Sequence, residues 1–164
     1  MTETPTMQDL IYIEICEDNI EPADSLVLPF ADRQKARQRV HMCSGRTAGL
    51  KLPRGTVLRG GDKIRSEDGS VALIIAAAED VSRVRASDQI ALARAAYHLG
   101  NRHVWLEVGD GWLRYLADHV LDDMVRNLGV AVDTQRAPFE PEAGAYSHRS
   151  SHTATNGHVH DHDH

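Results

Sequence analysis

The stretch His103-Val-Trp-Leu-Glu-Val-Gly-Asp-Gly-Trp-Leu-Arg-Tyr-Leu-Ala117 decides how the second half of the chain is expected to fold. Apolar residues alternate with other residues on both sides of Gly109-Asp-Gly111, a pattern typical of two antiparallel strands joined by a tight turn. With Asp110 and Gly111 in the turn, Glu107 lies opposite Arg114 and forms a cross-strand ion pair. The sequence therefore predicts a β-hairpin with strands at 103–108 and 112–117.

The same register places His103 opposite Asp118, next to His119. Because side chains alternate along a strand, His103 is expected on the open face of the sheet. Asp122 and Asp123 follow His119 by three and four residues and share the polar side of a predicted helix. The topology would thus gather imidazoles and carboxylates at one edge of the domain. A slip of one residue would instead turn His103 into the core.

Around the hairpin, the apolar pattern predicts further strands and helices. Residues 71–76 and 81–85 are predicted strands, and a helix capped by Ser87 or Asp88 stops at Gly100-Asn101. A second helix begins at the cap Asp118 and ends at Gly129, before a last strand at 130–132. The order β-α-β-β-α-β is that of a ferredoxin-like fold. We therefore predict an α+β protein with a ferredoxin-like domain at residues 76–137.

Residues 1–75 are predicted to form a small all-β domain. Strand-like segments alternate with turn signals, and no helical period of useful length occurs. The predicted strands are residues 10–15, 25–28, 39–43, 50–52 and 56–58. From Arg33 to Arg65 this domain has ten lysines or arginines against the single acid Asp62. This basic stretch is either the solvated side of short strands or a docking surface for an acidic partner.

Residues 138–164 form the third predicted part, a disordered segment rich in histidine. Small and polar residues follow position 138 without an apolar period, which favours disorder. A flexible segment of this length reaches about 30 Å, far enough to visit the folded domain. Alternation of histidine with aspartate indicates metal binding, because neighbouring imidazoles can reach one ion. The histidines are His148, His152, His158, His160, His162 and His164.

Composition and charge exclude several classes of function. The formal net charge of −6 gives no basic balance for nucleic-acid binding, and no stretch approaches the ~20 apolar residues of a membrane span. The start of the sequence lacks the basic and apolar regions of a signal peptide. Cys16 and Cys43 form no CxxC motif, so reduced thiols and a cytoplasmic location are expected.

Imidazole and carboxylate groups are ligands for nickel, copper, zinc and cobalt, and the folded part offers His98, His103 and His119. Each also has an ordinary interpretation. His98 would be a helix surface residue, His103 a solvent-facing strand residue and His119 part of a plain helix N-terminus. No HExxH or paired CxxC motif points to a zinc hydrolase or a structural zinc site. A hydrolase using His119, Asp122 and Asp123 would lack an identifiable nucleophile or general base. Since one chain offers few fixed ligands around His103, a two-fold dimer is the simplest way to complete a site.

Four segments resemble the UreE family of urease accessory proteins, and together they extend over nearly the whole chain. They are RQKARQR at 33–39, GRTAGLKLPRGTVLRGGD at 45–62, ARAAYHLGNRHVWLEV at 93–108 and DHVLDDM at 118–124, followed by the histidine-rich end. The resemblance implies a cytoplasmic, homodimeric nickel metallochaperone with no reaction of its own. It would deliver Ni(II) to urease apoprotein together with other accessory proteins, notably a GTPase.

The resemblance also assigns parts of the chain to roles. The N-terminal domain resembles a chaperone peptide-binding domain, and the C-terminal domain a ferredoxin-like metal-binding domain. His103 would be the principal metal ligand at the dimer interface, with His98 and His119 as additional ligands. Ala117 stands where some members have a further histidine, and the histidine-rich end would raise metal capacity.

Two further expectations concern partners and the alternative function. In the basic stretch, Arg37, Arg39 and Arg54 are the residues expected to contact protein partners. The alternative function is a general divalent-metal store or buffer, because the same ligands also suit Zn(II) and Cu(II).

Overall fold

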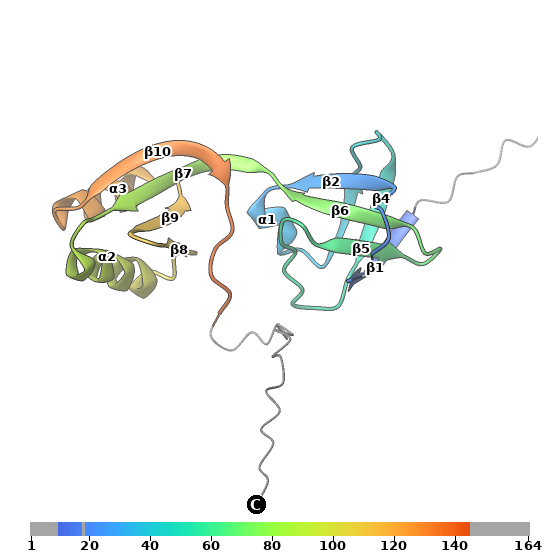
Figure 1. Cartoon of the computed structure of the whole chain (residues 1–164), viewed down its shortest axis with the longest axis horizontal. Coiled ribbons are helices and arrows are strands. Elements are labelled where there is room, and N and C mark those ends of the chain that lie inside the picture. Colours follow the sequence, from blue (N-terminus) through green and yellow to red (C-terminus); the bar gives the residue numbers. More distant parts are fainter. Residues whose placement is uncertain (1–9, 18, 145–164) are drawn as a thin grey trace, which may run out of the picture.

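The computed structural model describes residues 10–17 and 19–144, which form two β-sheets in two neighbouring halves (Figure 1). The first half is a six-stranded sheet with the order β2-β6-β5-β1-β4-β3. Its strands are β1 (Leu10–Cys16), β2 (Asp24–Leu28), β3 (Arg37–His41), β4 (Thr47–Lys51), β5 (Lys63–Ser66) and β6 (Val71–Ala76). Alternate apolar residues face inward and form one core around Tyr12, Leu26, Leu50, Leu58 and Ile64. The predicted β-rich N-terminal part is confirmed.

Two details of this half differ from the prediction. A single helical turn, α1 (Phe30–Arg33), follows β2, where the sequence predicts no helix. Residues 56–58 form no strand, and β5 lies further along the chain. Leu58 instead contacts the end of α1, where its backbone N–H donates to the carbonyl oxygen of Arg33 over 2.9 Å.

The second half is a four-stranded sheet with two helices. Its elements follow in the order β7 (Ala78–Arg85), α2 (Gln89–Asn101), β8 (Glu107–Gly109), β9 (Trp112–Leu116), α3 (His119–Asn127) and β10 (Ala131–Pro138). The strand order is β10-β7-β9-β8. Both helices bury apolar residues against the same strands, so one core contains Leu99 of α2, Val125 of α3 and Tyr115 of β9. The predicted β-α-β-β-α-β order is therefore present.

Both predicted helix starts are confirmed by their caps. The carboxylate of Asp88 accepts a hydrogen bond from the backbone N–H of Ile90. Asp118 accepts in the same way from Val120 and Leu121, which satisfies two N–H groups that have no partner inside α3. Gly129, with a φ of 82°, follows the end of α3 as predicted.

The predicted hairpin is only half as long as expected. Its register is correct next to the turn, where Glu107 pairs with Arg114 and Gly109 with Trp112. However, β8 contains only residues 107–109, so the predicted strand at 103–106 and the pairing of His103 with Asp118 are wrong. The reason is that α2 extends through Asn101, and its C-terminal cap uses the backbone of the next residues.

The predicted disorder from residue 138 onward is also wrong at its start. Pro138 ends β10, and the side chain of Phe139 is fully buried. Figure 1 shows the segment after β10 descending between the two halves of the molecule. The order of the chain thus extends at least to Gly144, and residues 145–164 lie outside the described part.

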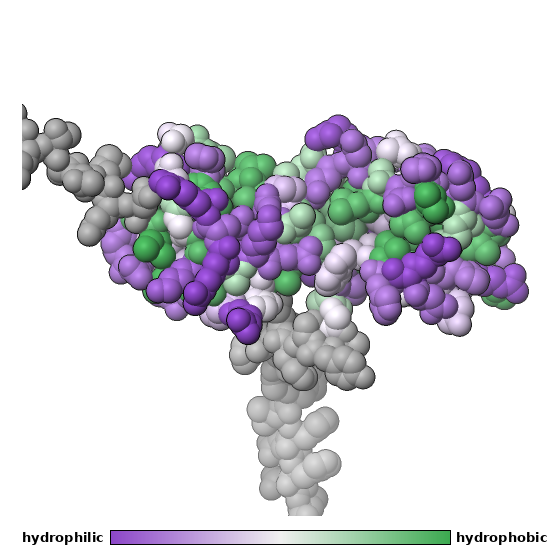
Figure 2. All heavy atoms as spheres, turned by 180° about the vertical axis from the view of Figure 1, so that it is seen from behind, coloured by the Kyte–Doolittle hydropathy of each residue, from purple (hydrophilic) through white to green (hydrophobic). Residues whose placement is uncertain are grey.

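The surface of the described residues is mainly polar. Figure 2 shows hydrophilic side chains over most of both halves, with hydrophobic side chains reaching the surface in patches. In the second half, large exposed apolar side chains are Ile90, Tyr97, Trp105, Val108 and Val120. Within residues 10–17 and 19–144, no helix has the length and apolar character needed to cross a membrane. Cys16 and Cys43 are both free thiols, as predicted.

Candidate functional site

His103 occupies an unusual backbone position at the end of α2. Its φ is 56°, and it is the only residue other than glycine with a positive φ among those described. Its N–H donates to the carbonyl oxygen of Gly100 over 2.9 Å, and that of Val104 donates to Leu99 over 3.3 Å. These two bonds form a Schellman motif, in which glycine is the usual residue at the position of His103. The motif turns the chain sharply and leaves the His103 side chain exposed.

His98 lies one turn earlier on the exposed side of α2. Its ring meets the ring of Tyr97 edge to face, with centroids 5.4 Å apart. Tyr97 is 65% exposed and Ile90, two helical turns before it, is 63% exposed. Residues seven apart lie on one side of a helix, so α2 carries an uncovered apolar stripe beside His98.

His119 is the first residue of α3 and is exposed. Of the two acids expected beside it, only Asp123 is exposed, and it forms an ion pair with Arg126 at 3.1 Å. Asp122 is instead buried, and its Oδ1 accepts a hydrogen bond of 2.7 Å from the hydroxyl of Tyr115. Burial, followed by this bond to Asp122, raises the pKa of Tyr115. Because the Asp122 carboxylate holds β9 to α3, it is unsuited to a hydrolytic site.

The three candidate histidines of the second half, His98, His103 and His119, do not form a complete metal site in one chain. Within the described residues, no group of three or more histidine, cysteine or acidic side chains lies close enough to hold an ion. Exposed imidazoles at the end of α2 and the start of α3 can therefore supply ligands only in combination with others. The remaining predicted ligands, His148, His152, His158, His160, His162 and His164, lie outside the described residues.

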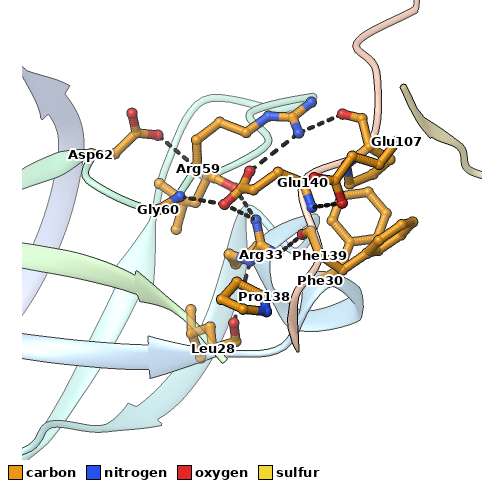
Figure 3. Close-up of polar contacts among 12 residues, drawn as sticks. Leu28, Phe30, Arg33, Arg59, Gly60, Asp62, Glu107, Pro138, Phe139 and Glu140 are labelled. Atoms are coloured by element: carbon orange, nitrogen blue, oxygen red, sulfur yellow. Dashed lines mark hydrogen bonds and ion pairs between the residues drawn. The ribbon is translucent and has the colours of Figure 1, made fainter. Parts of the chain in front are cut away.

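The junction between the two halves is a second concentration of polar side chains (Figure 3). Arg33, at the end of α1, is fully buried. Its guanidinium donates to the carbonyl oxygens of Leu28 and Leu58, at 3.2 and 3.3 Å, and to that of Phe139. It also forms an ion pair of 3.0 Å with Glu140. A buried arginine is costly unless its donors are satisfied, and here the chain beyond β10 supplies two of the acceptors.

Glu140 connects three further groups at this junction. One carboxylate oxygen accepts from the backbone N–H of Gly60 over 2.8 Å, and the other pairs with Arg59 at 3.3 Å. Arg59 also donates to the carbonyl oxygen of Pro141 over 2.6 Å. On the other side, the N–H of Glu140 donates to Glu107, the partner of Arg114 in the confirmed cross-strand ion pair. Residues 139–142, hereafter the strap, therefore join both halves.

Sequence reasoning missed this junction. Arg33 is one of many cations in the basic stretch, and nothing in its immediate neighbours marks it for burial. One signal was available in the composition, because the chain contains only two phenylalanines, Phe30 and Phe139. They meet edge to face with centroids 5.5 Å apart, and Trp105 packs on Phe30 at 5.3 Å.

The predicted partner-binding arginines are exposed on the first half. Arg37 and Arg39 lie on β3, the edge strand of the six-stranded sheet, and Arg54 lies in the turn before Gly55. Arg37 is directly opposite Lys51 of β4. Like charges in opposite positions of a sheet are unfavourable, which makes this face a suitable surface for anions.

Comparison with known proteins covers both halves of the chain. The UreE urease accessory protein N-terminal domain matches residues 5–77, and the UreE urease accessory protein C-terminal domain matches residues 79–164. The chain belongs to the UreE family. The boundary between the two matched domains coincides with the passage from β6 to β7.

Individual UreE relatives align over most of their length. The urease accessory protein UreE of Alkalilimnicola ehrlichii is 57% identical over 126 residues, which are 76% of this chain and 77% of that protein. The UreE of Cupriavidus necator is 54% identical over 138 residues, or 83% of this chain and 72% of the relative. The UreE of Alcanivorax borkumensis is 49% identical over 157 residues, or 92% and 87%. By family role, a UreE protein is an accessory chaperone and not a catalyst.

Proposed function

We propose that this chain binds Ni(II) as cargo and delivers it to urease apoprotein during maturation of the urease active site. The observation that carries the proposal is the position of His103. A residue with a Cβ atom in the left-handed region costs roughly 1 kcal/mol compared with glycine, so the Schellman motif alone would favour glycine. An imidazole retained at that position and exposed to solvent is explained by a ligand role. Nickel readily accepts imidazole ligands.

The metal site is completed, in this proposal, by a second copy of the chain. One chain provides no three-ligand group within the described residues, whereas a two-fold axis near His103 would bring two copies of each imidazole together. The exposed stripe of Ile90 and Tyr97 on α2 supplies apolar surface for such contact beside His98. His119 contributes from the start of α3. The second half then serves as a ferredoxin-like metal-binding domain of a homodimer.

The histidine-rich end supplies additional ligands in this proposal. Its imidazoles, from His148 to His164, capture Ni(II) and pass it to His103. Affinity depends on pH, because protons compete for imidazole below about pH 6.5. Delivery occurs in the cytoplasm, through contacts of Arg37, Arg39 and Arg54 with urease or with its accessory proteins, including the GTPase.

Calorimetric titration with Ni(II) tests this function. The intact chain should bind more ions than a chain ended at Ala145, which keeps the strap but lacks the later histidines. In the shortened chain, His103→Ala should remove the tightest remaining site without unfolding the protein. Unchanged affinity after this substitution would exclude His103 as a ligand. Equal preference for Zn(II) and Ni(II), with normal urease activity in a deletion strain, would instead favour a general metal store.

A further inference from the structure

We propose that Phe30 and Trp105 position His103 for metal binding, so that the first half of the molecule holds a metal ligand carried by the second half. Phe30 begins α1 in the first half, and Trp105 follows His103 by two residues. Both aromatic residues would act through residues 102–106, hereafter the His103 loop, without touching the metal. The inference rests on the proposed function, because it assumes that His103 binds the ion.

The His103 loop lies between α2 and β8 and belongs to no helix or strand. On the side of the second half, Val104 and Leu106 of this loop pack against the core of that half. Trp105, between these two residues, packs on Phe30 of the first half, with ring centroids 5.3 Å apart. The loop is therefore held from both halves of the molecule.

Phe30 is a fixed anchor for Trp105. Its ring is buried and also meets Phe139 of the strap edge to face, with centroids 5.5 Å apart. The guanidinium of Arg33 lies 5.4 Å from the centroid of the same ring. The backbone N–H of Phe30 donates to the carboxylate of Glu79 on β7 over 2.8 Å. Phe30 thus contacts both halves and the strap, and Figure 3 shows it beside Arg33 and Phe139 at the junction.

The strap holds the end of the same loop. The backbone N–H of Glu142 donates to the carbonyl oxygen of Leu106 over 2.8 Å. Consecutive anchors at Trp105 and Leu106 leave the loop little freedom. His103 precedes Trp105 by two residues, so even a fully extended chain keeps their Cα atoms within about 7 Å of each other. The contact with Phe30 therefore limits where the imidazole of His103 can lie.

A double-mutant cycle in the full chain, with Ni(II) as the probe, separates positioning from a merely structural role. Trp105 is 45% exposed, so its truncation removes little from a core. Trp105→Ala should weaken the tightest Ni(II) site by about five-fold or more, because the freed loop must be ordered again when the ion binds. In the His103→Ala background, Trp105→Ala should leave the Ni(II) affinity unchanged.

Trp112→Ala is the matched control for the loss of an indole. Trp112 lies in the neighbouring hairpin, where its ring packs near the guanidinium groups of Arg83 and Arg114. The substitution should therefore lower stability without changing the affinity for Ni(II).

Two further variants test the contact with Phe30. Trp105→Phe keeps an aromatic ring in the loop and should restore most of the affinity that Trp105→Ala loses. Phe30→Leu keeps an apolar side chain in the junction but removes the ring, so it should weaken Ni(II) binding to a similar extent. Phe30→Met takes its place if the leucine variant does not fold. Combining Phe30→Leu with Trp105→Ala should weaken the site no further, because the two rings form one contact.

Hydrogen exchange of the His103 and Val104 amides provides a readout without metal. Their hydrogen bonds tie the loop to the last turn of α2. Trp105→Ala should speed their exchange by about five-fold or more, because a loop that has lost its anchor opens more often. The amide of Leu128, which bonds to Val125 at the end of α3, should exchange at an unchanged rate.

The proposal is overturned if the exchange rates of the two loop amides do not change, or if Trp105→Ala weakens Ni(II) binding equally with and without His103. Failure of Trp105→Phe to restore the affinity would overturn it as well. If His103→Ala alone leaves the Ni(II) affinity unchanged, the proposed role of His103 fails, and its positioning fails with it. Exchange is measured without metal, so it shows separately whether Phe30 and Trp105 hold the loop.

Discussion

The hydroxyl of Tyr115 on β9 donates a hydrogen bond of 2.7 Å to Oδ1 of Asp122 on α3, and both side chains are buried. Tyr115→Phe removes the donor and leaves a buried carboxylate whose ion pair with Arg126 is long, at 4.0 Å. We expect a loss of about 1–3 kcal/mol in the free energy of unfolding, measured by urea denaturation. Tyr97→Phe is the matched control, because Tyr97 is exposed. Equal stability of the two variants would contradict a supporting role for the Tyr115–Asp122 bond.

The same tyrosine should make the fold sensitive to alkaline pH. Burial and the bond to Asp122 raise the pKa of Tyr115 above its ordinary value of 10.0, which applies in the unfolded chain. The stabilisation is therefore complete below pH 10 and is lost as the pH rises above that value, because the unfolded chain releases its proton first. Urea midpoints should fall between about pH 9 and pH 11, and less steeply in Tyr115→Phe. Identical slopes in the two proteins would be inconsistent with this linkage.

His103 offers a way to separate stability from metal binding. In His103→Gly the Schellman motif gains its usual residue. We expect the free energy of unfolding, measured by thermal denaturation, to rise by roughly 1 kcal/mol. His103→Ala keeps a Cβ atom at a φ of 56° and should gain little or nothing. Both substitutions remove the imidazole, so both should weaken Ni(II) binding to the same extent in calorimetric titration. A glycine variant that binds Ni(II) like the unaltered chain would show that His103 is retained for another reason.

Two glycines in the second half should respond in opposite ways to the same substitution. A Cβ atom at Gly109 would lie 2.0 Å from the indole ring of Trp112, so Gly109→Ala must displace that ring. We expect Gly109→Ala to lower the free energy of unfolding by about 1–3 kcal/mol and to change the tryptophan fluorescence. Gly100 lies within α2, where a Cβ atom would meet nothing within 4 Å beyond its chain neighbours and its own helix backbone. Gly100→Ala should therefore raise the free energy of unfolding by about 0.5–1 kcal/mol. Equal effects in thermal unfolding would contradict the packing of Trp112 on Gly109.

The elements that local sequence determines were predictable. The turn at Asp110 and Gly111 fixes the pairing of Glu107 with Arg114, because neighbouring residues alone determine a tight hairpin. The caps Asp88 and Asp118 were visible for the same reason, since a cap acts only on the next few residues. The helix ends at Asn101, as predicted, but the residue in the left-handed region is His103 and neither Gly100 nor Asn101, which sequence preference does not anticipate.

The junction was not predictable because its partners are far apart along the chain. Arg33 can be buried because Glu140 neutralises its charge and the carbonyl oxygen of Phe139 accepts one of its hydrogen bonds. Both partners lie more than a hundred residues later in the chain. The small and polar residues after Pro138 favour disorder when considered alone. Packing of Phe139 against Phe30 overrides that preference. Residues that depend on one distant partner leave no periodic pattern in the sequence.

Charge reversal on β3 tests whether the first half docks an acidic partner. In Arg37→Glu/Arg39→Glu, the exposed edge of the sheet changes sign, and the unfavourable pairing of Arg37 with Lys51 becomes favourable. We therefore expect the thermal stability to be unchanged or slightly higher. Association with the urease complex should weaken by about ten-fold or more in a pull-down at low salt. Arg85→Glu/Arg136→Glu is the matched control, because it changes the net charge equally at exposed positions of the other sheet. If both double variants associate like the unaltered chain, β3 is a solvated surface, and if both weaken equally, the effect is one of net charge alone.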